Sequence, residues 1–291
     1  MSLLKNAQAS PSRVYAIYSL ILQMPDKRIE MDLLKRLLAP QAFASKDRNE
    51  TDFIGATIPE VITLGLIHQE SAGILSISDQ VPSELLLSDS VDVALPNAIR
   101  EKIMSQANDE NNNNEDLVKV IAWYMSQNPY KAPGNWASVE ESLLKQLNTK
   151  LDCSSDARYG QFEDWVMYLG FASRIQKYLL PDPSHVIRYY LPTLFRDKRT
   201  HNIDTIIKRL AEICPVFERG RYREWLTQQF GVENLREGQL SQVTSFAFMR
   251  LHDEKLIRLE KKSDADVYLF TENQETYRYS EITWCAQEAN H

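Results

Sequence analysis

The amino-acid sequence predicts a mainly α-helical fold with small β-wings, arranged as three tandem winged helix-turn-helix-like units. Apolar residues recur at three- and four-residue steps in most segments, which predicts amphipathic helices. Glycine often follows such a segment and a short apolar or alternating stretch comes next, which predicts a helix end and a small hairpin. The copies share this order but little sequence, unlike the fixed-period repeats of solenoids.

The first unit is expected over residues 1–80. Two amphipathic stretches after Pro11 predict its first two helices. Thr57 and Glu60 form a capping box that predicts the start of a third helix, and Gly65 is well placed to end it. The apolar segments on either side of the turn ESAG are expected to pair as the wing.

An acidic connector and an asparagine-rich flexible linker are expected over residues 81–116, because the tract ANDENNNNED lacks apolar anchors. The second unit is expected over residues 117–199. Its tryptophans lie within amphipathic helices, which favours core packing over base stacking. The third unit is expected over residues 200–291. There the segment LIRLEKKSDADVYLF alternates around the turn KSDAD, so its two halves are expected to pair as a wing.

The distribution of charge is more informative than its sum. The chain has 33 Lys and Arg against 40 Asp and Glu, and a net charge of −7 argues against coating nucleic acid with the whole surface. Residues 174–223 nevertheless carry 11 basic and 5 acidic side chains, so contact with a polyanion is expected there first. No Lys or Arg lies between Arg48 and Arg100, so the first unit is expected to dock a protein or act as scaffold.

Candidate DNA contacts concentrate in the third unit and the basic stretch before it. Helix-turn-helix proteins place the third helix in the major groove, while basic residues hold phosphates. The start of the third helix, GQLSQVTSFAF, offers side chains that can hydrogen-bond base edges, including glutamine, which matches adenine. We therefore expect duplex DNA to contact Arg196, Lys198, Arg199, Lys208, Arg209, Arg219, Arg221, Arg223, Gln239, Ser241, Gln242, Thr244, Arg258, Lys261 and Lys262. In the alternative, these charges only solvate exposed helix faces and pair with Glu212, Glu218, Glu254 and Glu260.

Sequence features of enzymes and of membrane proteins are missing. The five histidines are scattered, and the patterns GxxxxGK[ST], GxSxG and HExxH are absent, so no catalytic residue, metal site or cofactor is predicted and the chain is expected not to be an enzyme. Three cysteines far apart in the sequence fit a reducing compartment, and no apolar run approaches the roughly 20 residues that span a bilayer. We expect a cytoplasmic protein without membrane contact.

Three segments carry a resemblance to a known family: ASPSRVYAIYSLIL, LGLIHQESAGILSISD and WVMYLGFASRIQKYLLPDPSHVIRYYLP. They resemble DpdG, a component of the bacterial Dpd islands that place 7-deazapurine derivatives in DNA and restrict unmodified DNA. The resemblance covers most of the chain. It implies a member of the restriction arm, acting beside helicase-like and nuclease-like partners, with no catalytic residues of its own.

These observations predict a non-catalytic DNA-binding or adaptor subunit of a bacterial anti-phage DNA restriction assembly. Its expected partners are duplex DNA and other subunits of a defence complex, and homo-oligomerisation is left open. Two alternatives remain at this point: a winged-helix transcriptional regulator and a purely protein-binding scaffold.

Overall fold

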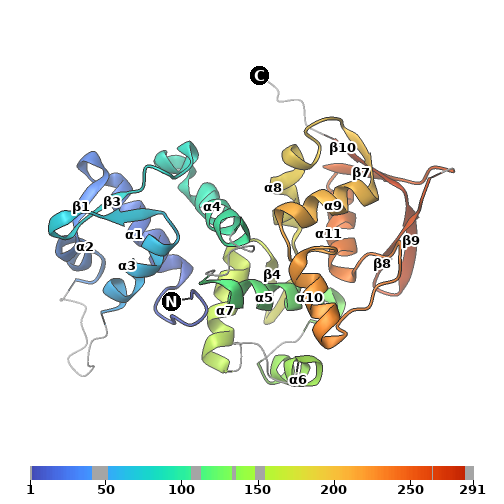
Figure 1. Cartoon of the computed structure of the whole chain (residues 1–291), viewed down its shortest axis with the longest axis horizontal. Coiled ribbons are helices and arrows are strands. Elements are labelled where there is room, and N and C mark those ends of the chain that lie inside the picture. The colour runs from blue at the N-terminus through green and yellow to red at the C-terminus, as the bar shows by residue number, and fades with distance from the viewer. Residues whose placement is uncertain are drawn as a thin grey trace.

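The protein is mainly helical, with small antiparallel sheets. The computed structural model describes residues 2–40, 52–105, 113–132, 136–147, 155–263 and 265–285. Figure 1 shows an N-terminal lobe in blue and cyan and a C-terminal lobe in yellow to red, joined by green helices. One continuous apolar core runs through all three parts. Most of the predicted asparagine-rich linker, residues 106–112, lies outside the described residues.

The N-terminal lobe contains the first predicted hairpin. Its elements are α1 (Pro11–Gln23), β1 (Arg28–Glu30), α2 (Met31–Leu38), α3 (Phe53–Thr63), β2 (Ile67–Gln69) and β3 (Ile74–Ile77). Strands β2 and β3 pair with Ile67 opposite Ile77, which confirms the predicted hairpin. Strand β1, which was not predicted, pairs with the other edge of β3 and gives the sheet order β1-β3-β2.

Helix α3 begins earlier than the sequence suggested. The Asp52 side chain accepts a hydrogen bond from the Gly55 amide at 2.6 Å, so Asp52 is the N-cap. The expected capping box is therefore wrong, because Thr57 and Glu60 lie inside the helix and are at most 2% exposed. Their spacing matches a capping box, but their polar atoms are used elsewhere in the fold.

The middle of the chain folds into helices and one hairpin. Its elements are α4 (Val91–Ser105), α5 (Glu115–Tyr124), α6 (Trp136–Leu147), α7 (Asp156–Tyr168), β4 (Ala172–Ile175) and β5 (Tyr178–Pro181). Helix α4 lies within the stretch expected as a connector, and it buries Leu95, Ile99 and Ile103 in the core. Trp123 and Trp165 are also buried, which agrees with core packing.

The C-terminal lobe corrects the predicted third wing. Its elements are α8 (Ser184–Leu194), β6 (Thr200–Asn202), α9 (Ile203–Ile213), α10 (Arg221–Phe230), α11 (Gln242–Asp253), β7 (Ile257–Glu260), β8 (Tyr268–Glu272), β9 (Glu275–Tyr279) and β10 (Glu281–Trp284). The two halves of LIRLEKKSDADVYLF form β7 and β8, but they do not pair with each other. Strand β7 pairs with β10, and β8 pairs with β9. Alternation identified these strands, but their partners follow later in the chain.

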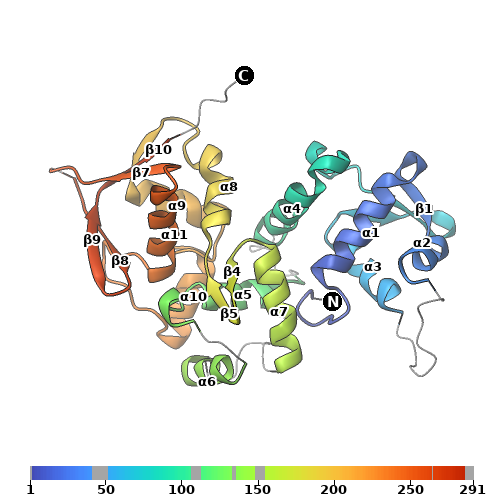
Figure 2. The ribbon, with the colours of Figure 1, turned by 180° about the vertical axis from the view of Figure 1, so that it is seen from behind.

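The two three-stranded sheets have the same order of strands. In the C-terminal lobe the order is β6-β10-β7, in which the last strand lies between the first and the second, as β3 does between β1 and β2. In both lobes the first strand runs directly into a helix, at Met31 and at Ile203. Helix α8 packs against α9 and α11, and Figure 2 shows it beside them in the C-terminal lobe.

Residues 2–9, which we call the N-terminal clasp, lie between α3 and α7, and most of them are buried. On the α3 side, Asn6 donates from Nδ2 to Glu60 Oε1 at 3.1 Å. Thr57 donates from Oγ1 to the backbone carbonyl of Gln8 at 2.8 Å. The two residues that resembled a capping box therefore hold the N-terminal clasp.

On the α7 side, two buried side chains bind the backbone of the N-terminal clasp. The amide nitrogen of Gln161 lies 3.1, 3.2 and 2.9 Å from the carbonyl oxygens of Leu3, Asn6 and Ala9. Trp165 donates from Nε1 to the Ala9 carbonyl at 3.0 Å. Because buried carbonyls need donors, α7 supplies those that the turns of this segment do not supply themselves.

Arg100 connects the middle of the chain to the C-terminal lobe. Its side chain is 2% exposed, and Nη1 donates to the Leu169 carbonyl at the end of α7 at 2.9 Å. The guanidinium also lies 4.9 Å and 5.3 Å from the ring centroids of Tyr189 and Tyr190 on α8. A desolvated cation over aromatic rings is a favourable contact, so Arg100 holds α4, α7 and α8 together.

Replacing Gln161 by alanine is expected to lower the free energy of unfolding by about 1–3 kcal/mol, the cost of one unsatisfied buried group. The substitution leaves the Leu3 carbonyl buried without its donor, whereas the Asn6 carbonyl still accepts from the Ala9 amide. Urea unfolding followed by circular dichroism measures the difference. The matched control is Gln228→Ala, at an exposed position of α10, where a change below about 0.5 kcal/mol is expected. Equal losses in both variants would contradict the role given to Gln161.

Candidate nucleic-acid interface

The structure places the predicted DNA contacts in different environments. The buried ones are Arg223, Ser241 and Thr244. Those that are at least partly exposed but paired with a carboxylate are Lys208, Arg209, Arg219, Arg221, Arg258 and Lys262. Those that are exposed and make no ion pair with any described residue are Arg196, Lys198, Arg199 and Lys261. The remaining two, Gln239 and Gln242, are half-buried.

Ser241 and Thr244 are structural, which corrects their expected role in contacting bases. Both are 1% exposed. The Ser241 side chain caps α11 by accepting from the Thr244 amide at 3.1 Å. Glu218 accepts from the Ser241 amide at 2.8 Å and from the Thr244 hydroxyl at 2.7 Å. A helix start whose donors are satisfied by a buried carboxylate has none to offer a base edge.

Strand β8 covers the first half of α11. The Leu240 amide donates to the Leu269 carbonyl at 3.1 Å, and the Leu269 amide donates to the Gly238 carbonyl at 2.7 Å. One turn further on, the Thr271 amide donates to the Ser245 hydroxyl at 3.1 Å. The N-terminal half of α11 is therefore enclosed by its own lobe, and it cannot lie in a major groove in this conformation.

Arg223 is also structural, which corrects its expected role as a phosphate contact. It is 6% exposed, and Nη1 donates to the Met125 carbonyl at 2.7 Å. The other terminal nitrogen pairs with Glu233. Burial raises the pKa of the Glu233 carboxyl, while the charge of Arg223 opposes that shift. Arg223 therefore ties α10 both to the end of α5, through Met125, and to the segment after α10, through Glu233.

Asp204 neutralises two of the predicted cations. Its carboxylate lies 2.7 Å from Lys208 Nζ and 2.6 Å from Arg219 Nη1, and it accepts from the Tyr268 hydroxyl at 2.7 Å. These partners, Lys208 foremost, lower the pKa of Asp204 to about 2. The carboxylate therefore stays charged at neutral pH and offsets much of the positive potential at this surface.

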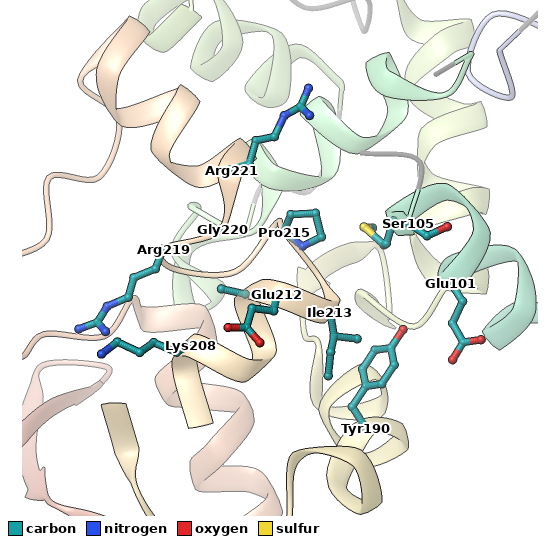
Figure 3. A pocket seen from close by; sticks show the side chains of 12 residues that line it. Glu101, Ser105, Tyr190, Lys208, Glu212, Ile213, Pro215, Arg219, Gly220 and Arg221 are labelled. Carbon is teal, nitrogen blue, oxygen red and sulfur yellow. The ribbon is translucent and has the colours of Figure 1, made fainter. Parts of the chain in front are cut away.

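A cleft of about 660 Å³ opens next to these residues, between α4, α8, α9 and the start of α10 (Figure 3). Lys208 and Arg219 lie at one end of it, and Tyr190 and Glu101 lie at the other. Its charged groups do not converge on one point, so the cleft lacks the arrangement of a specific anion site.

A second carboxylate, Asp197, shapes the loop between α8 and β6. Arg209 binds it in a bidentate manner, with Nη1 and Nη2 donating to Oδ1 and Oδ2 at 2.7 and 3.1 Å. His201 Nε2 lies 3.0 Å from Oδ1. The pKa of Asp197 lies well below its usual range, mainly because Arg209 donates to the carboxylate and also because His201 lies beside it. Asp197 therefore faces Arg209, and the flanking Arg196, Lys198 and Arg199 make no ion pair within the part of the chain that the structure describes.

The outer face of the C-terminal sheet carries balanced charge. Arg258 lies 3.3 Å from Glu260, and Lys262 lies 3.1 Å from Glu281. These pairs are exposed, so each contributes little to stability but does reduce the local potential. Of the predicted cations of the third wing, only Lys261 has no ion pair with a described residue.

The hairpin β4–β5 carries two basic residues, Arg174 and Lys177, that the list of predicted DNA contacts did not include. Ile175 pairs with Tyr178 across a two-residue turn made by Gln176 and Lys177. In the sequence, Ile175 and Tyr178 flank the polar pair Gln176 and Lys177, and this pattern is a usable signal for a hairpin turn. It is a weak one, however, because Gln-Lys lacks the glycine or asparagine typical of two-residue hairpin turns.

Two features, a membrane-spanning helix and a metal site, are absent from the described residues. No helix among them is both long and apolar enough to cross a membrane. No group of three or more His, Cys, Asp or Glu side chains among them is arranged to hold a metal ion.

Comparison with known proteins gives one match. A model of the family described as DpdG-like matches residues 1–265. No curated protein and no solved structure matches the chain. The matched residues include the N-terminal lobe, the middle helices and most of the C-terminal lobe, and they indicate involvement in the Dpd system. The chain belongs to the DpdG-like family.

Proposed function

We propose that this chain is a non-catalytic adaptor subunit of the restriction assembly of a Dpd system, and that it holds duplex DNA through its phosphates rather than by reading bases. The observation that carries the proposal is that three helices, α3, α7 and α11, make their polar contacts within the chain itself. Helices α3 and α7 hold the N-terminal clasp, and α11 is covered by β8 and bound by Glu218. Elements that read bases in other helix-turn-helix proteins pack here against the chain itself.

The proposal includes three winged-helix-like units. In the first, the order α1-β1-α2-α3-β2-β3 matches the order expected of such a unit. The third repeats it as α8-β6-α9-α11-β7-β10, with α10 and the β8–β9 hairpin inserted, and shares its sheet order. The second is the shorter series α5-α6-α7-β4-β5. This division assigns α8 to the third unit, because α8 packs on α9 and α11.

The proposed phosphate contacts are the cations left without a carboxylate partner. Arg196, Lys198 and Arg199 share one exposed loop, whose shape is set by the bidentate pair between Asp197 and Arg209. Phosphate contacts supply most sequence-independent affinity for DNA, and they do not require a helix in the groove. Because the chain as a whole has a net charge of −7, contact with DNA would be limited to local clusters of cations such as this loop.

The N-terminal lobe is proposed to face a protein partner. Its residues from 52 to 99 contain no Lys or Arg, whereas Glu84, Asp89 and other carboxylates are exposed. A surface of this charge repels phosphates and suits a basic protein surface. The proposal leaves nucleic-acid chemistry to other subunits, since the sequence carries none of the nucleotide-binding or hydrolase motifs described above.

Charge reversal in the loop tests the DNA contact. The double variant Lys198→Glu with Arg199→Glu should weaken binding to mixed-sequence duplex DNA at least tenfold. It should also lower the slope of log K against log salt by about 2, because roughly 0.9 is lost for each phosphate contact. Fluorescence anisotropy across a salt titration measures both. The control, Lys27→Glu with Arg36→Glu, has the same change in net charge on the N-terminal lobe and should change affinity less than threefold. Equal effects of the two variants would refute a localised contact.

Sequence preference separates the adaptor from a transcriptional regulator. Dissociation constants for unrelated duplexes of equal length should agree within about tenfold, since phosphates carry no base information. A regulator would prefer one site by roughly a thousandfold or more. Competition binding with a random duplex library provides the measurement. Selection of one motif would favour the regulator, and absence of DNA binding at low salt would favour a protein-only scaffold.

A further inference from the structure

The hairpin β4–β5 is held firmly at its base. Arg174 on β4 pairs with Glu163 on α7 at 3.0 Å. Ser173 donates from its hydroxyl to Asp182 at 2.8 Å, and Asp182 also pairs with Arg250 on α11. Both strands are therefore anchored to packed helices, so the hairpin projects from a rigid support.

The tip of this hairpin exposes large apolar side chains next to a free cation. Ile175 is 57% exposed and Tyr178 is 40% exposed, and the two form the closing pair of the turn. Lys177 Nζ lies 5.3 Å from the Tyr178 ring centroid and makes no ion pair with a described residue. Gln176 has φ +54°, in the left-handed region that tight hairpin turns require. Two large apolar side chains held outward at a rigid tip contribute little to the core, so they are available to a partner.

Helix α8 lies between this hairpin and the loop that holds Arg196, Lys198 and Arg199. The hairpin lies directly below α8 in Figure 2, and the loop with Arg196, Lys198 and Arg199 follows the other end of the helix. The 11 residues of α8 span about 16 Å. Arg188, between the two ends, is neutralised by Glu254. The cations without an ion pair to a described residue therefore lie beyond opposite ends of α8, a separation that is comparable with the helical turn of duplex DNA, about 34 Å.

We propose that the tip of the β4–β5 hairpin inserts into a groove of duplex DNA, with Ile175 and Tyr178 as an apolar wedge and Lys177 on a phosphate. This inference rests on the proposed DNA contact and adds a second, apolar point of attachment to it. Charge favours nucleic acid over a protein, because the cations between residues 174 and 223 that make no ion pair with a described residue lie at this tip and in the loop after α8: Lys177, Arg196, Lys198 and Arg199. Apolar wedges flanked by cations are the means by which minor-groove proteins unstack base steps and bend DNA.

The first experiment separates the wedge from the phosphate contacts. In the full chain, Ile175→Ser with Tyr178→Ser should weaken binding to mixed-sequence duplex DNA about tenfold while leaving the salt slope unchanged, since no charge is removed. Lys177→Glu should reduce the slope by about 0.9. The control is Leu37→Ser, on α2 in the N-terminal lobe, where an apolar side chain is 48% exposed. It should bind DNA as the unmodified chain does.

The second readout reports unstacking directly. A duplex carrying a fluorescent adenine analogue should brighten when the unmodified chain or the Leu37 variant binds, and should stay dim when the Ile175 and Tyr178 double variant is bound at saturation. Unchanged affinity of the double variant, or loss of affinity without any brightening by the unmodified chain, would overturn the wedge. If either of these two outcomes is found but the Lys198→Glu with Arg199→Glu variant still loses affinity for duplex DNA, the proposed phosphate contact stands. If the unmodified chain fails to bind even at low salt, both proposals fall.

Discussion

Burial of the N-terminal clasp is the constraint on which the first two thirds of the molecule depend. The turns of residues 2–9 satisfy only some of their own backbone carbonyls, so burying most of this segment requires further donors from elsewhere. Gln161 and Trp165 supply them from α7, and Thr57 supplies one from α3. The two helices are thereby held on opposite sides of one segment. Arg100 extends the same principle to α8, since its buried guanidinium needs the Leu169 carbonyl and two aromatic rings.

This packing limits what the helices can do. A helix face that accepts or donates buried hydrogen bonds within the chain cannot present those groups to a base edge without breaking them, and each break leaves a buried polar group unsatisfied. In α11 the same holds for the Ser241 cap and its Glu218 partner. In the proposed function DNA is therefore held by loops and a hairpin tip, which suit phosphates and groove shape better than base sequence.

Electrostatic pairing explains why a basic stretch is not by itself an interface. The excess of cations between residues 174 and 223 is visible in the sequence, but the partners that neutralise them are not all local. Lys208 pairs with Asp204 one helical turn away, whereas Arg219 reaches the same carboxylate from the start of α10, and Arg188 pairs with a residue 66 positions away. The alternative expectation named Glu212, Glu218, Glu254 and Glu260 as partners; of these, Glu254 pairs with Arg188 and Glu260 with Arg258, whereas Lys208 and Arg219 use Asp204. Lys198 and Arg199 make no ion pair with a described residue.

The sequence alone determined the helical character, the first hairpin, the burial of Trp123 and Trp165 and the location of the basic stretch, because each follows from periodicity or composition within a short window. It also contained the segments that resemble the DpdG family. Only the tertiary structure decided that β7 pairs with β10, that the expected connector contributes α4 to the core, and that Ser241, Thr244 and Arg223 are interior. The physical reason is the same in each case. Strand partners, buried hydrogen-bond acceptors and ion pairs come from residues far apart in the chain, and which of them meet depends on how the helices pack.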